Sequence, residues 1–228
     1  MKGVSKYQAA TFIAILFHAI GIGGILFFDS EWVIRSTPIN LLIMFILLIW
    51  TQPGKNKNFW LFFLTCFSIG LGAEITGVNT GFLFGDYKYG NVLGQQIKNV
   101  PLIIGLNWFI IIYCCGISIH MLLAKLTNPG SLAAMPGSKI LKALSVIIDG
   151  AMLAALFDWL MEPVAVKLNY WNWNTAAIPW FNYFCWFIIS SLLLTVFQIC
   201  KFEKKNKFAV NLLLVQLMFF MILRTFLT

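Results

Sequence analysis

Seven long runs of apolar residues, separated by short polar or glycine-rich stretches, dominate this sequence. The apolar core of a bilayer is roughly 30 Å thick, and an α-helix crosses it in about 20 residues. Such runs predict membrane-spanning helices, because a helix satisfies its own backbone hydrogen bonds where water is absent. The expected spans are 8–28, 37–52, 59–75, 100–124, 139–162, 179–200 and 208–227. The predicted fold class is therefore all-α, a polytopic transmembrane helix bundle of about seven spans forming one integral membrane domain over residues 1–228.

Composition also places the chain in lipid. Hydrophobic residues make up 60% of the sequence and charged residues 11%, whereas a soluble domain carries about 25% charged residues. The first apolar run follows Lys2 and Lys6, as in a signal peptide, but no A-x-A cleavage site comes after it, so we expect a retained helix. The five cysteines lie in apolar runs without C-x-x-C spacing, which favours packing roles over disulfides or a zinc site.

The basic residues divide unequally between the two sides of the expected bundle. Eleven fall on the side of the N-terminus and five on the other, which predicts a cytoplasmic N-terminus. Most of the net charge of +8 is then a topology signal, and no nucleic-acid partner is expected. The eleven are Lys2, Lys6, Lys55, Lys57, Lys125, Lys139, Lys142, Lys201, Lys204, Lys205 and Lys207, and the five are Arg35, Lys88, Lys98, Lys167 and Arg224.

Four acidic residues lie within the apolar spans, where each charge costs roughly 2.5–3.5 kcal/mol. Asp158 and Glu162 are four residues apart, so they share a helix face near the non-cytoplasmic end. Glu74 is expected to close an earlier helix at the same end, as Glu162 closes its own, whereas Asp149 lies deeper and on the opposite face. Three carboxyl groups can therefore meet at one depth.

Carboxyl groups that crowd together in a low-dielectric environment disfavour one another's charge, so at least one is expected to stay protonated near neutral pH. A neutral carboxylic acid beside an ionised one is an acid/base pair. The alternative is a structural role, in which the acids reach the interface or bind neighbouring polar groups.

Two stretches share one layout, which suggests an internal repeat. An acid is followed by two aromatic residues one position apart, a proline, and a tryptophan seven residues after the proline. The first copy has Glu74, Tyr87-x-Tyr89, Pro101 and Trp108; the second has Glu162, Trp171-x-Trp173, Pro179 and Trp186. The pattern predicts a parallel repeat of helical hairpins 59–124 and 139–200 with a site at their interface. Chance recurrence in so apolar a chain is the alternative.

The residues that several familiar classes of membrane protein require are absent from this sequence. No phosphate loop, nucleophile elbow, metal-spaced His/Glu set or dinucleotide fingerprint is present. His18 and His120 fall at different depths, so they cannot be the axial pair of one haem, and the last span has no internal lysine for retinal. We therefore expect no metal and no cofactor.

The aromatic loops and the acids carry a resemblance to a known family. The chain resembles the carotenoid biosynthesis family that includes carotenoid 1,2-hydratases and bisanhydrobacterioruberin hydratases, from about Glu74 to Trp186. Leu83 stands where that family usually has proline, and Glu162 where it usually has aspartate. The matching residues are Thr80-Gly81-Phe82-x-Phe84-Gly85-x-Tyr87-x-Tyr89, Leu93-Gly94, Val100-Pro101, Asn107-Trp108-Phe109, Asp158-Trp159-Leu160-Met161-Glu162-Pro163, Tyr170-Trp171-x-Trp173, Ile178-Pro179 and Asn182.

The resemblance implies a cofactor-independent hydro-lyase that adds water to the terminal C=C of an acyclic carotenoid end group. Its substrate would be a lycopene-like or γ-carotene-like polyene lying in the bilayer of a bacterial or archaeal cytoplasmic membrane. On this hypothesis Asp158 or Glu162 protonates the alkene, and Glu74 orients the water that attacks the tertiary carbocation. The expected substrate-binding residues are Tyr87, Tyr89, Asn107, Trp108, Trp171, Trp173, Asn182 and Trp186, with the two asparagines holding water or a carboxyl group.

Two alternatives stay open at the level of sequence. A carotenoid cyclase would use the same protonation but exclude water and let an internal alkene quench the cation. A proton-coupled transporter or lipid carrier would also need buried acids, although those are expected near the midplane. The sequence does not decide which end group is used, whether Asp149 takes part, or the oligomeric state.

Overall fold

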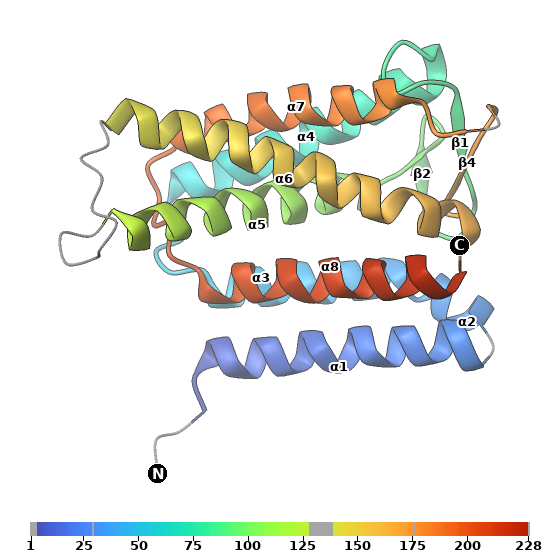
Figure 1. The fold of residues 1–228 in the computed structure, drawn as a ribbon, viewed down its shortest axis with the longest axis horizontal. Coiled ribbons are helices and arrows are strands. Elements are labelled where there is room, and N and C mark those ends of the chain that lie inside the picture. The colour runs from blue at the N-terminus through green and yellow to red at the C-terminus, as the bar shows by residue number, and fades with distance from the viewer. Residues whose placement is uncertain (1–3, 29, 128–138, 176, 228) are drawn as a thin grey trace.

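The computed structural model describes residues 4–28, 30–127, 139–175 and 177–227, and Lys2 lies outside them. Its long helices run side by side as one bundle, with the strands gathered at the end away from the N-terminus (Figure 1). The elements in order are α1 (Lys6–Phe27), α2 (Ser30–Arg35), α3 (Thr37–Thr51), α4 (Lys57–Thr80), β1 (Tyr87–Tyr89), β2 (Gln96–Ile97), β3 (Val100–Pro101), α5 (Ile103–Leu126), α6 (Lys139–Lys167), β4 (Trp171–Trp173), α7 (Trp180–Ile199) and α8 (Lys207–Leu227).

The seven expected spans correspond to seven apolar helices. Within the described residues, six helices are long and apolar enough to cross a membrane, namely α1, α4, α5, α6, α7 and α8, and α3 is a shorter apolar helix. The prediction of an all-α membrane bundle is therefore confirmed, and the protein is an integral, multi-pass membrane protein. Its outer surface carries many large apolar side chains, such as Phe12, Leu64 and Met218, which suit contact with lipid.

Two helix ends differ from the sequence-based expectation, because α4 continues past Glu74 and α6 continues past Glu162. Helix α4 ends only at Gly81, whose φ of 66° is the left-handed conformation that glycine adopts readily. Helix α6 contains Pro163, which has no N–H to donate to the carbonyl of Trp159 one turn earlier. Arg224 of α8 donates to that carbonyl at 2.7 Å, so the helix proceeds without an orphaned acceptor.

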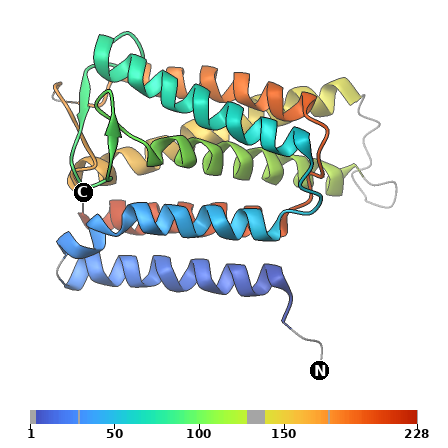
Figure 2. The same ribbon diagram turned by 180° about the vertical axis from the view of Figure 1, so that it is seen from behind.

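The most extensive helix packing joins α6 with α7, α4 with α5 and α1 with α8, and α5 also packs against α6. Small residues allow close approach: a Cβ on Gly116 or Gly150 would meet the side chain of Leu194 at 2.9 or 2.8 Å. Helix α1 lies at the edge of the bundle, against α8 (Figures 1 and 2). Helices α4, α5, α6 and α7 lie on the side of the bundle away from α1 (Figure 1), and together they surround the polar residues of the next section.

Short strands, which the sequence did not indicate, tie the two aromatic loops together. Strand β1 pairs antiparallel with β4, so that Tyr87 lies opposite Trp173 and Tyr89 opposite Trp171. Gly90 continues the contact by donating its N–H to the carbonyl of Tyr170 at 2.8 Å. The connection from α4 to α5 is thus joined to the connection from α6 to α7 over one end of the bundle (Figure 2).

Candidate active site

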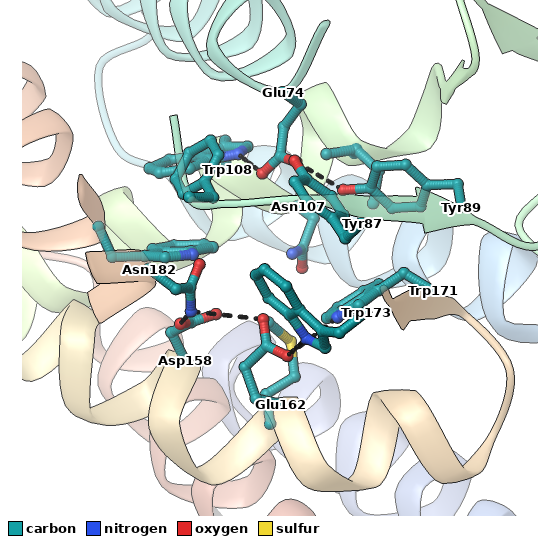
Figure 3. A pocket seen from close by; sticks show the side chains of 14 residues that line it. Glu74, Tyr87, Tyr89, Asn107, Trp108, Asp158, Glu162, Trp171, Trp173 and Asn182 are labelled. Carbon is teal, nitrogen blue, oxygen red and sulfur yellow. Dashed lines mark hydrogen bonds between the residues drawn. The ribbon is translucent and has the colours of Figure 1, made fainter. Parts of the chain in front are cut away.

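A small pocket, lined mostly by buried side chains, lies beneath the β1–β4 ribbon, among α4, α5, α6 and α7 (Figure 3). Its cavity volume is only about 20 Å³, which is room for about one water molecule. All eleven site residues expected from the sequence line it, namely Glu74, Tyr87, Tyr89, Asn107, Trp108, Asp158, Glu162, Trp171, Trp173, Asn182 and Trp186.

Glu74 is buried and receives three hydrogen bonds. The hydroxyls of Tyr87 and Tyr89 donate to its Oε2 at 2.5 and 2.7 Å, and the indole N–H of Trp108 donates to its Oε1 at 3.0 Å. Burial, together with the neighbouring Glu74 carboxylate, raises the pKa of Tyr87 and of Tyr89 well above the usual value for tyrosine. Both hydroxyls therefore remain donors at neutral pH, and this set of donors favours an ionised Glu74.

Glu162 has an equivalent shell of donors from the other loop. The indole N–H groups of Trp171 and Trp173 donate to its Oε2 at 3.0 and 2.9 Å, and the Asn182 amide is 3.5 Å from its Oε1. Each glutamate thus receives two donors from a strand residue pair and a third from a helix, α5 for Glu74 and α7 for Glu162.

Asp158 differs from both glutamates. It is fully buried, and the Asn182 amide donates to its Oδ2 at 2.6 Å. Its other oxygen, Oδ1, is buried without a hydrogen-bond partner in the described structure. A buried carboxylate with an unpartnered oxygen is costly, and a neutral carboxylic acid in the same place costs much less. The three carboxyl groups are therefore unequal: two are surrounded by donors and one is short of them.

Aromatic rings form the walls between these carboxyl groups. Trp108 and Trp186 stack with their centroids 3.9 Å apart, and Tyr87 lies 5.0 Å from Trp173. The amide of Asn107 projects into the space between the glutamates (Figure 3), and no described residue is hydrogen-bonded to it. An unpartnered amide in a pocket with room for water is suited to holding a water molecule.

No Lys or Arg in the described ranges forms an ion pair with Glu74, Asp158 or Glu162. Nor do those ranges contain a cluster of three or more His, Cys, Asp or Glu side chains placed to hold a metal ion. Asp149 lies outside the pocket, where Ser145 donates a hydrogen bond to it. The site therefore offers carboxyl groups, amide groups and aromatic faces.

Three lining residues were not among those expected from the sequence: Phe84, Ile104 and Met161. Ile104 and Met161 belong to apolar helices in which nothing distinguishes them from their neighbours. Phe84 lies within the glycine-flanked aromatic string that precedes β1, so a signal for it was present.

Comparison with known proteins gives two matches. Residues 37–228 match the family described as "Carotenoid biosynthesis protein". Over 139 residues the chain is 27% identical to the bisanhydrobacterioruberin hydratase of Haloarcula japonica, an alignment that covers 59% of this chain and 42% of that relative. The chain thus matches less than half the length of the relative. No solved structure matches the chain.

Proposed function

The chain belongs to the carotenoid biosynthesis protein family, and we propose that it hydrates the terminal C=C of an acyclic carotenoid end group. A carotenoid-modifying role follows from the family, and the partial match to a hydratase supports addition of water in particular. The observation that carries the proposal is the inequality of the three carboxyl groups, because protonation of an alkene needs a neutral acid and anions in the same apolar pocket stabilise the carbocation that forms.

Asp158 is the proton donor in this mechanism. Its Oδ1 has no partner in the pocket, so an O–H there is free to point at an alkene carbon. Transfer of that proton to the terminal C=C forms a C–H bond and leaves a tertiary carbocation, with the Asp158 carboxylate as its counter-charge. Asn182, which already bonds Oδ2, stabilises the new anion.

The two glutamates stabilise the cation as anions held in place. Each receives its donors before the reaction begins, so little reorganisation is needed when the positive charge develops. The faces of Trp173 and Tyr87, which lie close together, add an attraction of about 2 kcal/mol for a desolvated cation.

Water completes the reaction from the side of Asn107 and Glu74. The Asn107 amide holds the water, whose oxygen bonds to the cationic carbon while its proton passes to the Glu74 carboxylate. Return of that proton to Asp158 restores the starting state. The balance is alkene plus water giving a tertiary alcohol, with no oxidant or reductant consumed.

The test is expression of the chain in cells that accumulate lycopene, followed by mass analysis of the pigments. We expect a product heavier by one water. An isomer of unchanged mass would instead mean cyclisation. If neither lycopene nor any other acyclic carotenoid supplied is converted, both enzymatic activities are contradicted and a carrier is favoured.

The matched pair Asp158→Asn and Asp149→Asn tests the acid. Both substitutions replace an aspartate on α6 with asparagine, but only Asp158 lines the pocket. We expect Asp158→Asn to abolish the product and Asp149→Asn to retain it at equal protein level. Product formation by Asp158→Asn would remove Asp158 from the mechanism.

A further inference from the structure

The candidate active site is too small in this structure to admit a carotenoid end group, so a substrate needs a route into it. The pocket has room for about one water molecule, whereas a carotenoid end group is a branched carbon chain. At least one lining side chain must therefore move before Asp158 can meet an alkene.

Phe84 is the lining residue that regular structure constrains least. The other lining residues lie in α4, α5, α6, α7, β1 or β4, whereas Phe84 lies in the connection between α4 and β1. Its ring is buried, with 1% of the residue exposed, and its centroid is 6.3 Å from the rings of both Trp108 and Tyr87. The ring therefore fills part of the site without being fixed by a helix or a strand.

The backbone at Phe84 is strained. Its φ is 65°, and the N–H of Gly85 donates to the carbonyl of Leu83 at 2.7 Å, which closes a γ-turn with positive φ around Phe84. Such turns are rare and strained, and a bulky residue at positive φ is an outlier. The N–H of Phe84 donates only to the sulfur of Cys185, at 3.4 Å, and thioether or thiol sulfur is a weak acceptor. The strained backbone conformation is therefore maintained by the packing of the Phe84 ring, and the strain is relieved when the ring leaves the pocket.

Glycines bound this segment on both sides. Gly81 ends α4 with a φ of 66°, and Gly85 has a φ of 128°. Glycine reaches both conformations, and others, without the penalty that a side chain imposes. The four peptide links between them can therefore rearrange while α4 and β1 keep their positions.

The outer side of the segment carries apolar surface suited to lipid. Phe82 is 74% exposed, and Trp180, at the start of α7, is 75% exposed. The segment lies against that helix start, since a Cβ on Gly85 would be 3.0 Å from Cγ of Pro179. An apolar chain within the bilayer would thus meet the segment from the side, between the end of α4 and the start of α7.

We propose that residues 81–85 form a lateral gate and that Phe84 is its plug. The ring withdraws toward lipid, and the end group of the polyene takes its place beside Trp108 and Tyr87. The size of residue 84 then determines which end groups reach Asp158. The identity of the substrate rests on the proposed function, but the opening of the gate does not.

Cys185 reports the opening without any substrate. It is buried behind the segment and contacts the backbone of Phe84, so a maleimide reaches it only when the segment moves. In purified protein, labelling at each cysteine is followed by peptide mass spectrometry, with the buried Cys66 and Cys114 as internal references. We expect Phe84→Ala to raise the labelling rate of Cys185 about tenfold, because removing the ring shifts the local equilibrium toward the open segment.

Phe82→Ala is the matched control, because it removes an exposed ring from the same segment, and its Cys185 should label at the wild-type rate. Phe84→Leu keeps an apolar plug and should give an intermediate rate. If Cys185 labels no faster in Phe84→Ala and Phe84→Leu than in Phe82→Ala, the gate proposal is wrong. If Phe84→Ala also exposes Cys66 and Cys114 it has unfolded, and Phe84→Leu then decides.

A second measurement separates this inference from the proposed function. In lycopene-accumulating cells, Phe84→Trp enlarges the plug and should slow conversion about tenfold, while Cys185 of the purified variant labels no faster than in the wild type. Undiminished conversion by Phe84→Trp would contradict the plug. Absence of conversion in every variant, with Cys185 labelling as expected, would remove the hydratase and leave the gate.

Discussion

Trp108 and Trp186 stack across the pocket with their ring centroids 3.9 Å apart and their planes 9° from parallel. Trp108 belongs to α5 and also donates to Glu74, whereas Trp186 belongs to α7. The stack therefore links the packing of two helices to the hydrogen bonding of one carboxylate. Residues at equivalent places in hairpins 59–124 and 139–200 meet here, as a parallel repeat predicts, and the repeat itself stays a prediction.

Replacing Trp108 should reduce activity more than replacing its stacking partner. Trp108→Phe removes the N–H that bonds Glu74 at 3.0 Å, and a hydrogen bond to a charged group is worth about 1.5–3 kcal/mol, or about ten- to a hundredfold in rate. Trp186→Phe keeps an aromatic ring in the stack and removes no donor from a carboxylate. Initial rates of pigment conversion in membranes, normalised to protein level, compare the two. Equal losses would mean that packing, not the bond to Glu74, sets the rate.

Substitutions of the two pocket asparagines should impair different steps of the reaction. Asn182 bonds Asp158, so Asn182→Leu is expected to stop protonation and leave the substrate unchanged. Asn107 is proposed to hold water, so Asn107→Leu should still allow protonation but redirect the cation to isomers of unchanged mass. The fraction of hydrated product is expected to fall about tenfold, the effect of losing one polar contact to water. Mass analysis of the pigments distinguishes the outcomes, and an unchanged substrate in both variants would contradict the division of roles.

The sequence predicted the parts of this molecule that depend on local pattern. Length and apolarity located the spans, and the spacing of Asp158 and Glu162 placed both on one face of a helix. The carboxyl groups and aromatic residues singled out in this way line one pocket. What each of them does in the reaction stays a proposal.

Other features depended on partners distant in the chain. The helix was expected to end at Glu162, but it continues through Pro163, and Arg224, from the last helix, donates to the carbonyl that Pro163 leaves free. Strands β1 and β4 have three residues each, too few for a readable alternation, and they exist because each pairs with the other. The unequal hydrogen bonding of the three carboxyl groups likewise followed only from their tertiary neighbours.

Gly70 should tolerate no side chain, because it makes room for Trp108. A Cβ on Gly70 would lie 2.3 Å from Cγ of Trp108, whereas a Cβ on Gly72, in the same helix, would meet nothing within 4 Å. Overpacking of this kind costs about 1–3 kcal/mol, so Gly70→Ala should lower the melting temperature and the activity together. Gly72→Ala should leave both close to wild type. Thermal unfolding in detergent measures the difference, and a Gly70→Ala variant as stable and active as Gly72→Ala would contradict the tight fit.

Stability should decline at alkaline pH because buried tyrosines resist ionisation. In the unfolded chain tyrosine has a pKa of about 10, whereas burial raises the pKa of Tyr170 to about 12 and those of Tyr87 and Tyr89 well above the usual value. Above pH of about 10 the unfolded chain therefore loses protons that the folded chain retains, and the free energy of unfolding falls as pH rises. For Tyr170 the loss is confined to the interval between its two pKa values and amounts to about 2–3 kcal/mol. Denaturant unfolding across this range should show a shallower decline for Tyr170→Phe, although that variant starts lower because the bond to Thr37 is gone. Parallel pH profiles for the variant and the wild type would show that Tyr170 ionises equally in both states.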